Sequence, residues 1–337
     1  MQNTPALALS MILLGGITQA MFMLPSKWAK GWKFEHIWLV FSFFCFLLFP
    51  WAIVRACVPE IAAVLTGTGG HTLLLMGIYG TGWALASLSF GIGISMMGLS
   101  LGFALIFGLS AFLGSLAPLL LSTASVPHGK MLAIIPSLVL MLAGVFLCSL
   151  AGKWQEKQDA ASPVRGRYMK GILVCAFSGL MGAVGNLGFV AGGGMIVVAR
   201  AQGVSVFAAN MLVVAYLCLF LFILNASYSL ALLWQHSSFG VFLLNGSARY
   251  FGFAMLMAVF WIASFVLYGI GARVLGRLGL SLGWGVFMCT VVASANALGV
   301  LTGEWRLAPA AAKRQLGIGL GVLMIAIVGL TYANSIG

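Results

Sequence analysis

Ten long apolar stretches follow one another along the whole chain, separated by short polar connections. Each contains about 20 residues, the length that an α-helix needs to cross the hydrocarbon core of a bilayer. Continuous stretches of this kind exclude the alternating ten-residue strands of an outer-membrane barrel. We therefore predict an all-α membrane protein with ten transmembrane helices, at residues 5–25, 36–57, 72–95, 99–122, 131–151, 171–197, 206–233, 249–270, 279–301 and 316–335.

The composition excludes a water-soluble fold. Of the 337 residues, 62% are hydrophobic and 7% are charged, whereas a soluble domain carries about a quarter charged residues. The net charge of +12 does not indicate a nucleic-acid partner, because the cations lie in the connections, where they direct membrane insertion. The six cysteines lie in or beside apolar stretches without C-x-x-C spacing, so neither disulfides nor metal ligands are expected.

The cations are shared unequally between two sets of connections. The odd-numbered connections and the residues beside them hold twelve: Lys27, Lys30, Lys33, Lys153, Lys157, Arg165, Arg167, Lys170, Arg249, Arg306, Lys313 and Arg314. The even-numbered connections hold five: Arg55, Lys130, Arg200, Arg273 and Arg277. Cytoplasmic loops carry an excess of Lys and Arg. The odd-numbered connections are therefore predicted to be cytoplasmic and both termini periplasmic, in a bacterial inner membrane.

A polar connection divides the chain into two five-span halves. We place the first half at residues 1–151, a cytoplasmic linker at 152–170 and the second half at 171–337. Because each half has an odd number of spans, the second half is inserted upside down. Residues 83–98 and 261–276 both follow the pattern W-x6-[FY]-G-I-G-x3-[ML]-G, which indicates duplication. Two inverted repeats are typical of transporters that expose a central site alternately to either side.

The side chains within the spans are mostly uncharged. All Asp, Glu, Lys and His residues lie in connections or near span ends, so no buried carboxylate is expected. Amides and hydroxyls can bind the hydroxyls of a neutral sugar, and aromatic faces can cover its C–H groups. Each such residue also has a structural alternative, since serine hydroxyls often bond their own helix and tryptophans gather at membrane interfaces. The candidate substrate-binding residues are Gln19, Trp83, Ser87, Phe90, Asn186, Asn225, Trp261, Ser264 and Tyr268.

Several segments, taken in order, resemble one known family. They are Phe22–Trp32 with Glu35 and Trp38, residues 50–53, Gly80 and Trp83 with Phe90-Gly91, residues 98–102 through Gly108 and Pro118, Trp261 with Phe265, Tyr268 and Gly271, Trp284, and residues 303–305. Together they make the whole chain similar to the L-rhamnose–proton symporter family of the drug/metabolite transporter superfamily. The resemblance implies ten spans, an inner-membrane location and uptake of a deoxy sugar, and it adds Trp284 to the candidate substrate-binding residues.

The resemblance also implies a proton-binding group. Residues 278–284, where the resemblance suggests looking for a carboxylate, contain none. Two alternatives remain for the coupling ion: a proton on His36 at the cytoplasmic end, or a Na⁺ site made of carbonyls and hydroxyls.

These observations predict a secondary active transporter that takes up a neutral sugar by alternating access, coupled to protons. L-rhamnose or a related 6-deoxyhexose is the expected substrate. The alternative is an exporter or facilitator of another small neutral metabolite. An enzyme is not expected, because no paired acid and base or metal cluster lies at depth in the spans. We expect a functional monomer in the lipid bilayer, without a cofactor or a nucleic-acid partner.

Overall fold

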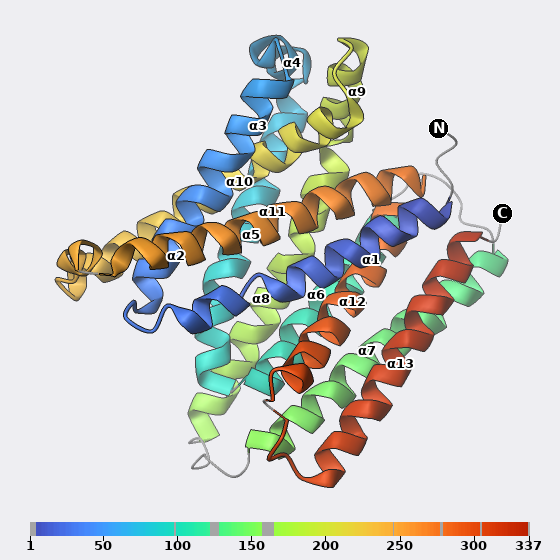
Figure 1. The fold of residues 1–337 in the computed structure, drawn as a ribbon. Helices are drawn as coiled ribbons and strands as arrows, with labels where there is room; N and C mark the ends of the chain where they lie inside the picture. Colours follow the sequence, from blue (N-terminus) through green and yellow to red (C-terminus); the bar gives the residue numbers. More distant parts are fainter. Residues whose placement is uncertain are drawn as a thin grey trace.

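The computed structural model describes residues 5–97, 99–121, 128–156, 165–244, 246–276, 279–303 and 305–335. In these ranges every regular element is a helix, which confirms an all-α fold (Figure 1). The elements are α1 (Pro5–Met21), η1 (Leu24–Trp28), α2 (Phe34–Ser42), η2 (Phe43–Leu48), α3 (Phe49–Cys57), α4 (Ile61–Gly67), α5 (Gly70–Met97), α6 (Leu99–Leu121), α7 (His128–Glu156), α8 (Arg165–Ala191), α9 (Gly193–Ala201), α10 (Val206–Gln235), η3 (Phe239–Leu243), α11 (Ser247–Val274), α12 (Gly279–Leu301) and α13 (Ala310–Ser335).

The membrane-spanning character of the chain is confirmed. Within the described ranges, nine helical segments are long and apolar enough to cross a bilayer. The helix α6 contributes a shorter apolar stretch, Leu105–Leu120. Of the predicted linker, residues 157–164 lie outside the described residues, and α7 and α8 extend into its two ends.

Two of the predicted spans are interrupted. The second span consists of α2, the π-helix η2 and α3. Pro50 follows η2 and has no amide to close the helical bond to the Phe46 carbonyl, which explains a change of helix type at this point. The sixth span ends as α8 at Ala191, and α9 follows it. The division falls at three consecutive glycines, Gly192–Gly194, which weaken a continuous helix.

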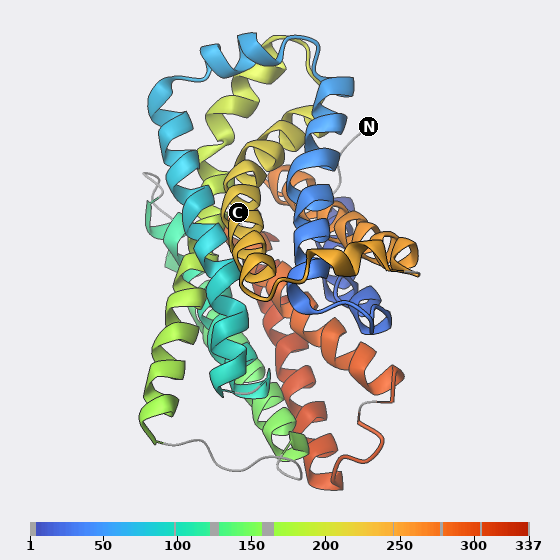
Figure 2. The ribbon, with the colours of Figure 1, turned by 90° about the vertical axis from the view of Figure 1, so that its left-hand side faces the viewer.

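The main helix pairs join the first part of the chain to the second. The helix α1 packs along α11 and α12, whereas α8 packs along α5 and α6. The helices α7 and α13 form a pair at the lower right of Figure 1. The helix α10 packs against α2, η2, α3 and α5, and the turned view in Figure 2 shows it between the blue and cyan helices. The core therefore lies between residues 5–156 and residues 165–335.

Glycines allow the closest of these crossings. A Cβ atom added at Gly15 in α1 would lie 2.8 Å from the backbone oxygen of Ser264 in α11. One added at Gly179 in α8 would lie 2.8 Å from the backbone oxygen of Ile106 in α6. Small residues matter here because helices in lipid associate through close packing and interhelical hydrogen bonds rather than through the hydrophobic effect.

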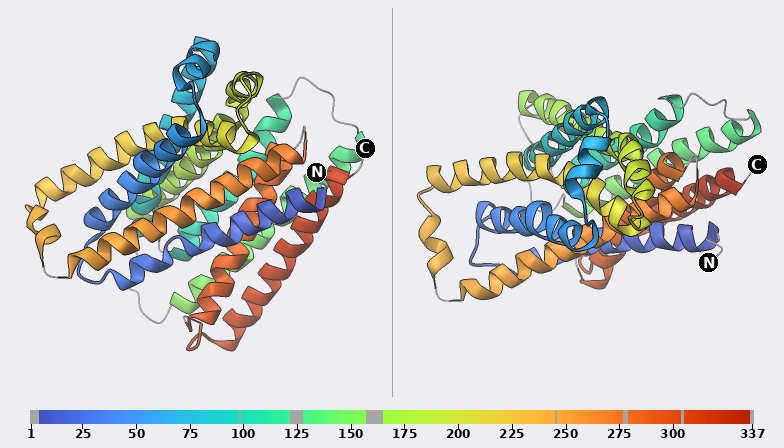
Figure 3. Two further views of the ribbon diagram at one scale, coloured as in Figure 1. Left: turned by 45° about the horizontal axis from the view of Figure 1, so that its top comes forward. Right: turned by 90° about the horizontal axis from the view of Figure 1, so that it is seen from above.

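Two connections from different parts of the sequence meet at one end of the molecule. The α1–α2 connection, which contains η1, and the α10–α11 connection, which contains η3, both lie at the left in Figure 3. The indole Nε1 of Trp32 donates a hydrogen bond to the Ser247 hydroxyl across this end, at 3.3 Å. Elsewhere α4 packs against α9, at the top of Figure 1.

Candidate functional site

An aromatic cluster occupies the contact between α5 and α11. The ring centroids of Trp83 and Trp261 are 5.5 Å apart. Phe265 packs against both, with ring centroids 4.9 Å from Trp83 and 4.4 Å from Trp261. Both tryptophans are buried, at 9% and 6% exposure. The two repeated motifs thus face each other inside the bundle rather than forming an interfacial aromatic belt.

A buried hydrogen-bond network connects α8 to three other helices. The Tyr268 hydroxyl donates to the Asn186 side-chain oxygen at 2.5 Å. The Asn186 side-chain nitrogen donates to the backbone oxygens of Gly114 and Leu280, each at 2.8 Å. Trp284 packs against Tyr268, with ring centroids 5.3 Å apart. All three side chains are buried, so in this conformation they hold α6, α8, α11 and α12 together.

Gln19 and Ser264 form a smaller link between α1 and α11. The Ser264 hydroxyl lies 2.5 Å from the Gln19 side-chain oxygen and 2.7 Å from the backbone oxygen of Trp261. The Ser264 hydroxyl therefore lies within hydrogen-bond distance of a backbone oxygen of its own helix, which is the structural role that serines often have in apolar helices. It also contacts Gln19, another candidate residue, in α1.

Asn225 brings α2, α5 and α10 together. Its side-chain oxygen accepts hydrogen bonds from the Trp38 indole at 2.9 Å and from the Ser87 hydroxyl at 3.0 Å. Its side-chain nitrogen donates to the backbone oxygen of Leu221 at 2.9 Å. Asn225 is fully buried, and an amide without partners would be costly there. We call Asn225, Ser87 and Trp38 the Asn225 cluster.

A partly open cavity of about 240 Å³ adjoins the Asn225 cluster through Ser87. The aromatic ring of Phe34, which lines the cavity, stacks on Trp38 with ring centroids 5.1 Å apart. The lining combines hydroxyl groups, aromatic rings and aliphatic side chains: Phe34, Ser87, Leu88, Gly91, Ile92 and Tyr228. Such a set can bind the hydroxyls of a small polyol and cover its apolar faces.

The structure separates the predicted residues into distinct groups. Ser87 lines the cavity and Asn225 lies directly behind it. Phe90 lies apart, packed against Phe107 of α6 at a centroid distance of 5.8 Å. The remaining seven belong to the contacts between helices described above: Gln19, Trp83, Asn186, Trp261, Ser264, Tyr268 and Trp284.

Sequence reasoning missed several residues of the cavity and its surroundings. Helical spacing could have found some of them, since Gly91 lies four residues after Ser87 and Ile92 four residues after Leu88, which makes each pair neighbours on the surface of α5. Tyr228 lies three residues after Asn225 and therefore on the same side of α10. The sequence contains no comparable signal for Phe34, because this residue belongs to a third helix, α2, which only the tertiary structure brings to the cavity.

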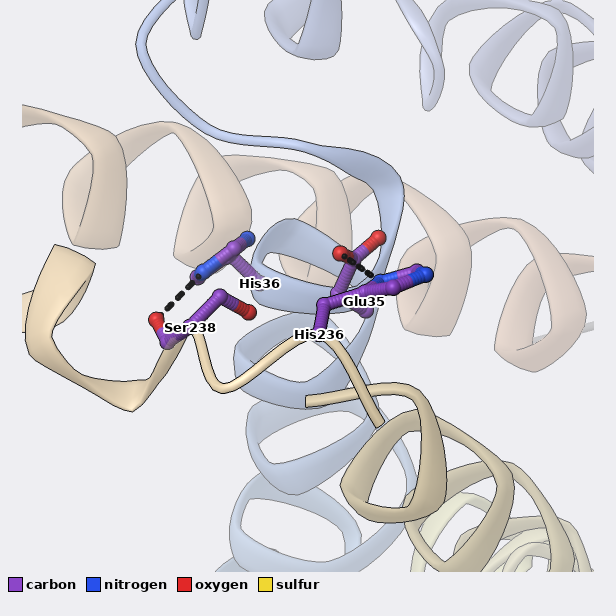
Figure 4. Close-up of polar contacts among 4 residues, drawn as sticks. All are labelled: Glu35, His36, His236 and Ser238. Atoms are coloured by element: carbon purple, nitrogen blue, oxygen red, sulfur yellow. Dashed lines mark hydrogen bonds and ion pairs between the residues drawn. The ribbon is translucent and has the colours of Figure 1, made fainter. Parts of the chain in front are cut away.

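The expectation of no buried carboxylate was wrong. Glu35 is buried, and its Oε1 lies 2.9 Å from Nδ1 of His236 (Figure 4). The neighbouring His36 is also buried, and its Nε2 donates to the Ser238 backbone oxygen at 3.0 Å. Glu35 does lie at a span end, as predicted, but there it contacts His236, which follows α10, and is 4% exposed.

Comparisons with known proteins agree along the whole chain. The family model RhaT, described as L-rhamnose-proton symport protein, matches residues 1–334. A protein of Pectobacterium atrosepticum named L-rhamnose-proton symporter is 26% identical over 353 residues, covering 99% of this chain and all of the relative. One of Yersinia pestis with the same name is 24% identical over 350 residues, with the same coverage. A solved structure described only as a crystal structure of protein aligns with a TM-score of 0.63 at 14% identity, covering 99% of this chain and all of that chain, and shows the same fold.

Proposed function

Since this chain belongs to the L-rhamnose-proton symport protein family, we propose that it takes up L-rhamnose or a related 6-deoxyhexose together with protons. The observation that carries the proposal is the family match, which extends over residues 1–334. Relatives named L-rhamnose-proton symporter align over their full length. The family is one of transporters, so the protein is not an enzyme.

The cavity beside Ser87 is the sugar site that we propose. A 6-deoxyhexose carries hydroxyls on its ring and a methyl group in place of one hydroxymethyl group. The Ser87 and Tyr228 hydroxyls can bind the ring hydroxyls, while Leu88 and Ile92 offer an apolar surface for the methyl group. Asn225 holds Ser87 in position. In this proposal the tryptophan cluster at Trp83 and Trp261 and the network at Asn186 form the closed contact between the halves, and they rearrange during transport.

The helix contacts support an inverted repeat and alternating access. Equivalent helices in the two halves would be α1 and α8, α2–α3 and α10, α5 and α11, α6 and α12, and α7 and α13. Exchanging them converts the contacts of α1 with α11 and α12 into those of α8 with α5 and α6. The pairs α6–α12 and α7–α13 each join two equivalent helices, so the exchange leaves these contacts unchanged. This agreement favours a tenth span in α6 and a twofold axis between the halves.

The test is transport by the purified protein in proteoliposomes. With a pH gradient directed inward, we expect saturable accumulation of labelled L-rhamnose that a protonophore abolishes and that replacement of Na⁺ by K⁺ leaves unchanged. One proton moved down ~100 mV is worth about 2.3 kcal/mol and supports roughly fifty-fold accumulation. Folded protein that shows no saturable rhamnose uptake would contradict the proposal. Equilibration without accumulation would favour a facilitator.

A further inference from the structure

Arg273, near the end of α11, joins three helices at one end of the molecule, which we call the Arg273 end. Its Nε donates to the Asn210 side-chain oxygen of α10 at 2.8 Å, and its Nη2 donates to the Phe189 backbone oxygen of α8 at 2.9 Å. Asn210 is buried, and its side-chain nitrogen donates to the Val206 backbone oxygen. We call Arg273, Asn210 and Phe189 the Arg273 contact. The helix α11 begins beside Trp32 at the α1–α2 connection, and its 28 residues carry Arg273 to the opposite end, roughly 40 Å away.

The Arg273 contact is strong enough to hold helices together and can still be opened. Phe189 lies in the last turn of α8, where the helix dipole favours a cation. A guanidinium carries its donors in one rigid plane, so it bonds an amide oxygen and a peptide oxygen at once. Both acceptors are neutral. Water can therefore replace them when the helices separate, whereas breaking a buried ion pair would leave an uncompensated charge.

An aromatic cluster lies between the Arg273 contact and the cavity. The ring of Phe189 is buried, and its centroid is 5.9 Å from that of Trp83 and 6.0 Å from that of Phe265. Trp83 precedes Ser87, which lines the cavity, by about one turn of α5. Phe189 therefore accepts from Arg273 with its peptide group and adds its ring to the cluster that separates this end from the cavity.

The two repeated motifs are open in one half and closed in the other. Gly91 and Gly269 stand at equivalent places in them, 178 positions apart. Gly91 lines the cavity, and a Cβ atom added there would meet no atom of the described residues within 4 Å. Gly269 is buried, and a Cβ atom added there would lie 3.4 Å from the Asn210 side-chain oxygen and 3.7 Å from the Phe189 ring. The two groups that Arg273 binds thus cover, in the second half, the place that is a cavity in the first.

We propose that Arg273 is the positioning residue that holds this end of the transporter closed, and that it releases Asn210 and Phe189 when the end opens to admit the sugar. The inference rests on the proposed function, because it assumes alternating access by two inverted repeats. When α11 moves away from α8 and α10, Gly269 gains an open surface like that of Gly91, and the cavity beside Gly91 closes. The excess of cations in the odd-numbered connections favours a periplasmic Arg273 end, where uptake begins.

Arg273→Gln, which removes the guanidinium, tests the proposal against a matched control. Arg200 is exposed and donates to the backbone oxygen of Val204, four residues later, at 2.8 Å. Arg200→Gln therefore also removes one positive charge and one hydrogen bond to a peptide oxygen, but no bond between long helices. A difference between the two variants reports the Arg273 contact rather than the loss of charge.

Two introduced thiols report which end is open. Cys57→Ser removes the exposed one of the six cysteines. In this background Gly269→Cys places a thiol at the covered position and Gly91→Cys places one in the cavity. The protein is held in lipid nanodiscs, where both ends face water, and is labelled with an impermeant maleimide in the absence of sugar. The background without an introduced thiol gives the blank.

We expect Arg273→Gln to raise the labelling rate at position 269 about tenfold, which corresponds to 1.4 kcal/mol in the opening equilibrium. The rate at position 91 should stay the same or fall, because opening one end closes the other. Arg200→Gln should leave both rates unchanged. A rate at position 269 that Arg273→Gln does not raise overturns the proposal. A rise at both positions also overturns it, because a bundle that has merely loosened exposes both thiols.

A second pair of thiols covers the case in which Gly269→Cys does not fold. Ile92 lines the cavity, and Ile270 is its equivalent 178 positions later, so Ile92→Cys and Ile270→Cys are read in the same way. Saturable rhamnose exchange by the unaltered protein is measured separately in proteoliposomes. Its absence would contradict the proposed function, whereas the labelling, which needs no sugar, decides the role of Arg273.

Discussion

A single amide organises the residues around the cavity. The Asn225 side-chain oxygen accepts from both Trp38 and Ser87, and its nitrogen donates within α10. Few other side chains can accept two hydrogen bonds and donate one in a fully buried position. The residue therefore determines where Ser87 faces the cavity and how α2 lies against α10.

Replacing this amide tests the proposed site. Asn225→Ala leaves the buried Trp38 indole without its acceptor, which costs about 1–3 kcal/mol. If Ser87 binds the sugar, we expect the KM for rhamnose exchange to rise about tenfold, the change that corresponds to 1.4 kcal/mol. Asn296→Ala is the matched control, because Asn296 in α12 also donates to the backbone oxygen four residues earlier but does not line the cavity. Equal KM changes in the two variants would contradict the proposed site.

The Tyr268 hydroxyl has a different role, which stability measurements can detect. Tyr268→Phe removes the hydrogen bond to Asn186 in a fully buried position. We expect the free energy of unfolding to fall by about 1–2 kcal/mol, seen as a lower Tm of the detergent-solubilised protein. Tyr332→Phe, at an exposed position of α13, is the comparison. A Tm unchanged by Tyr268→Phe would show that this network does not stabilise the resting conformation.

At the scale of the elements, the fold depends on how closely helices from the two halves approach. Gly15 and Gly179 lack the Cβ atoms that would keep α1 away from α11 and α8 away from α6. The irregular second span contributes a contact of another kind. Its π-helix η2 places Phe46 against Trp261, with ring centroids 5.0 Å apart, so a local change of helical pitch brings another aromatic ring to the tryptophan cluster.

The glycine contacts predict opposite effects for two equivalent substitutions. Gly15→Ala places a Cβ atom 2.8 Å from the Ser264 backbone oxygen and 3.3 Å from the Tyr268 nitrogen. Because these are backbone atoms, which cannot rotate away from the added Cβ atom as a side chain could, α1 and α11 must separate, at a cost of about 1–3 kcal/mol. Gly321→Ala in α13 meets no atom within 4 Å and gains up to about 1 kcal/mol of helix propensity. Thermal unfolding should show a lower Tm for the first variant only; a higher or unchanged Tm for Gly15→Ala would reject the close contact.

At the scale of the whole molecule, two connections from different halves of the chain share one end. The α1–α2 and α10–α11 connections meet at the end that holds the Glu35–His236 pair. The first turn of α1 and the last turn of α13 lie away from this end, at the right of Figure 1. From the excess of cations in the odd-numbered connections we propose that the Glu35 end faces the cytoplasm. This orientation would place the Glu35–His236 contact on the side where an uptake symporter releases its substrate.

Reporter fusions test this orientation. Alkaline phosphatase is active only after export, and green fluorescent protein fluoresces only in the cytoplasm when exported by the general secretory route. We expect a phosphatase fused after residue 337 to be active and the fluorescent fusion to be dark. A fusion within residues 157–164 should show the reverse. The opposite pattern would place the Glu35 end outside and contradict the proposed orientation.

Much of the architecture could be predicted from local sequence. The thickness of the bilayer sets the length of each apolar stretch, so span positions follow from composition within short windows. The hydrogen bonds of Ser87 and Asn225 were also predictable, because a polar side chain in an apolar helix needs partners; that these residues bind substrate stays a prediction. The interruptions at η2 and after Ala191 follow from Pro50 and from Gly192–Gly194, although their exact form depends on packing.

The sequence by itself determined the class of the protein and the apolar segments long enough to cross the membrane. Only the tertiary structure decided that Phe34 and Tyr228 share a cavity, that Phe90 lies apart from Trp83, and that Glu35 is buried. The physical reason is the distance along the chain over which each property is determined. Insertion into a bilayer depends on the residues of one helix, whereas the burial of Glu35 depends on a connection 201 residues away, whose position no local pattern specifies.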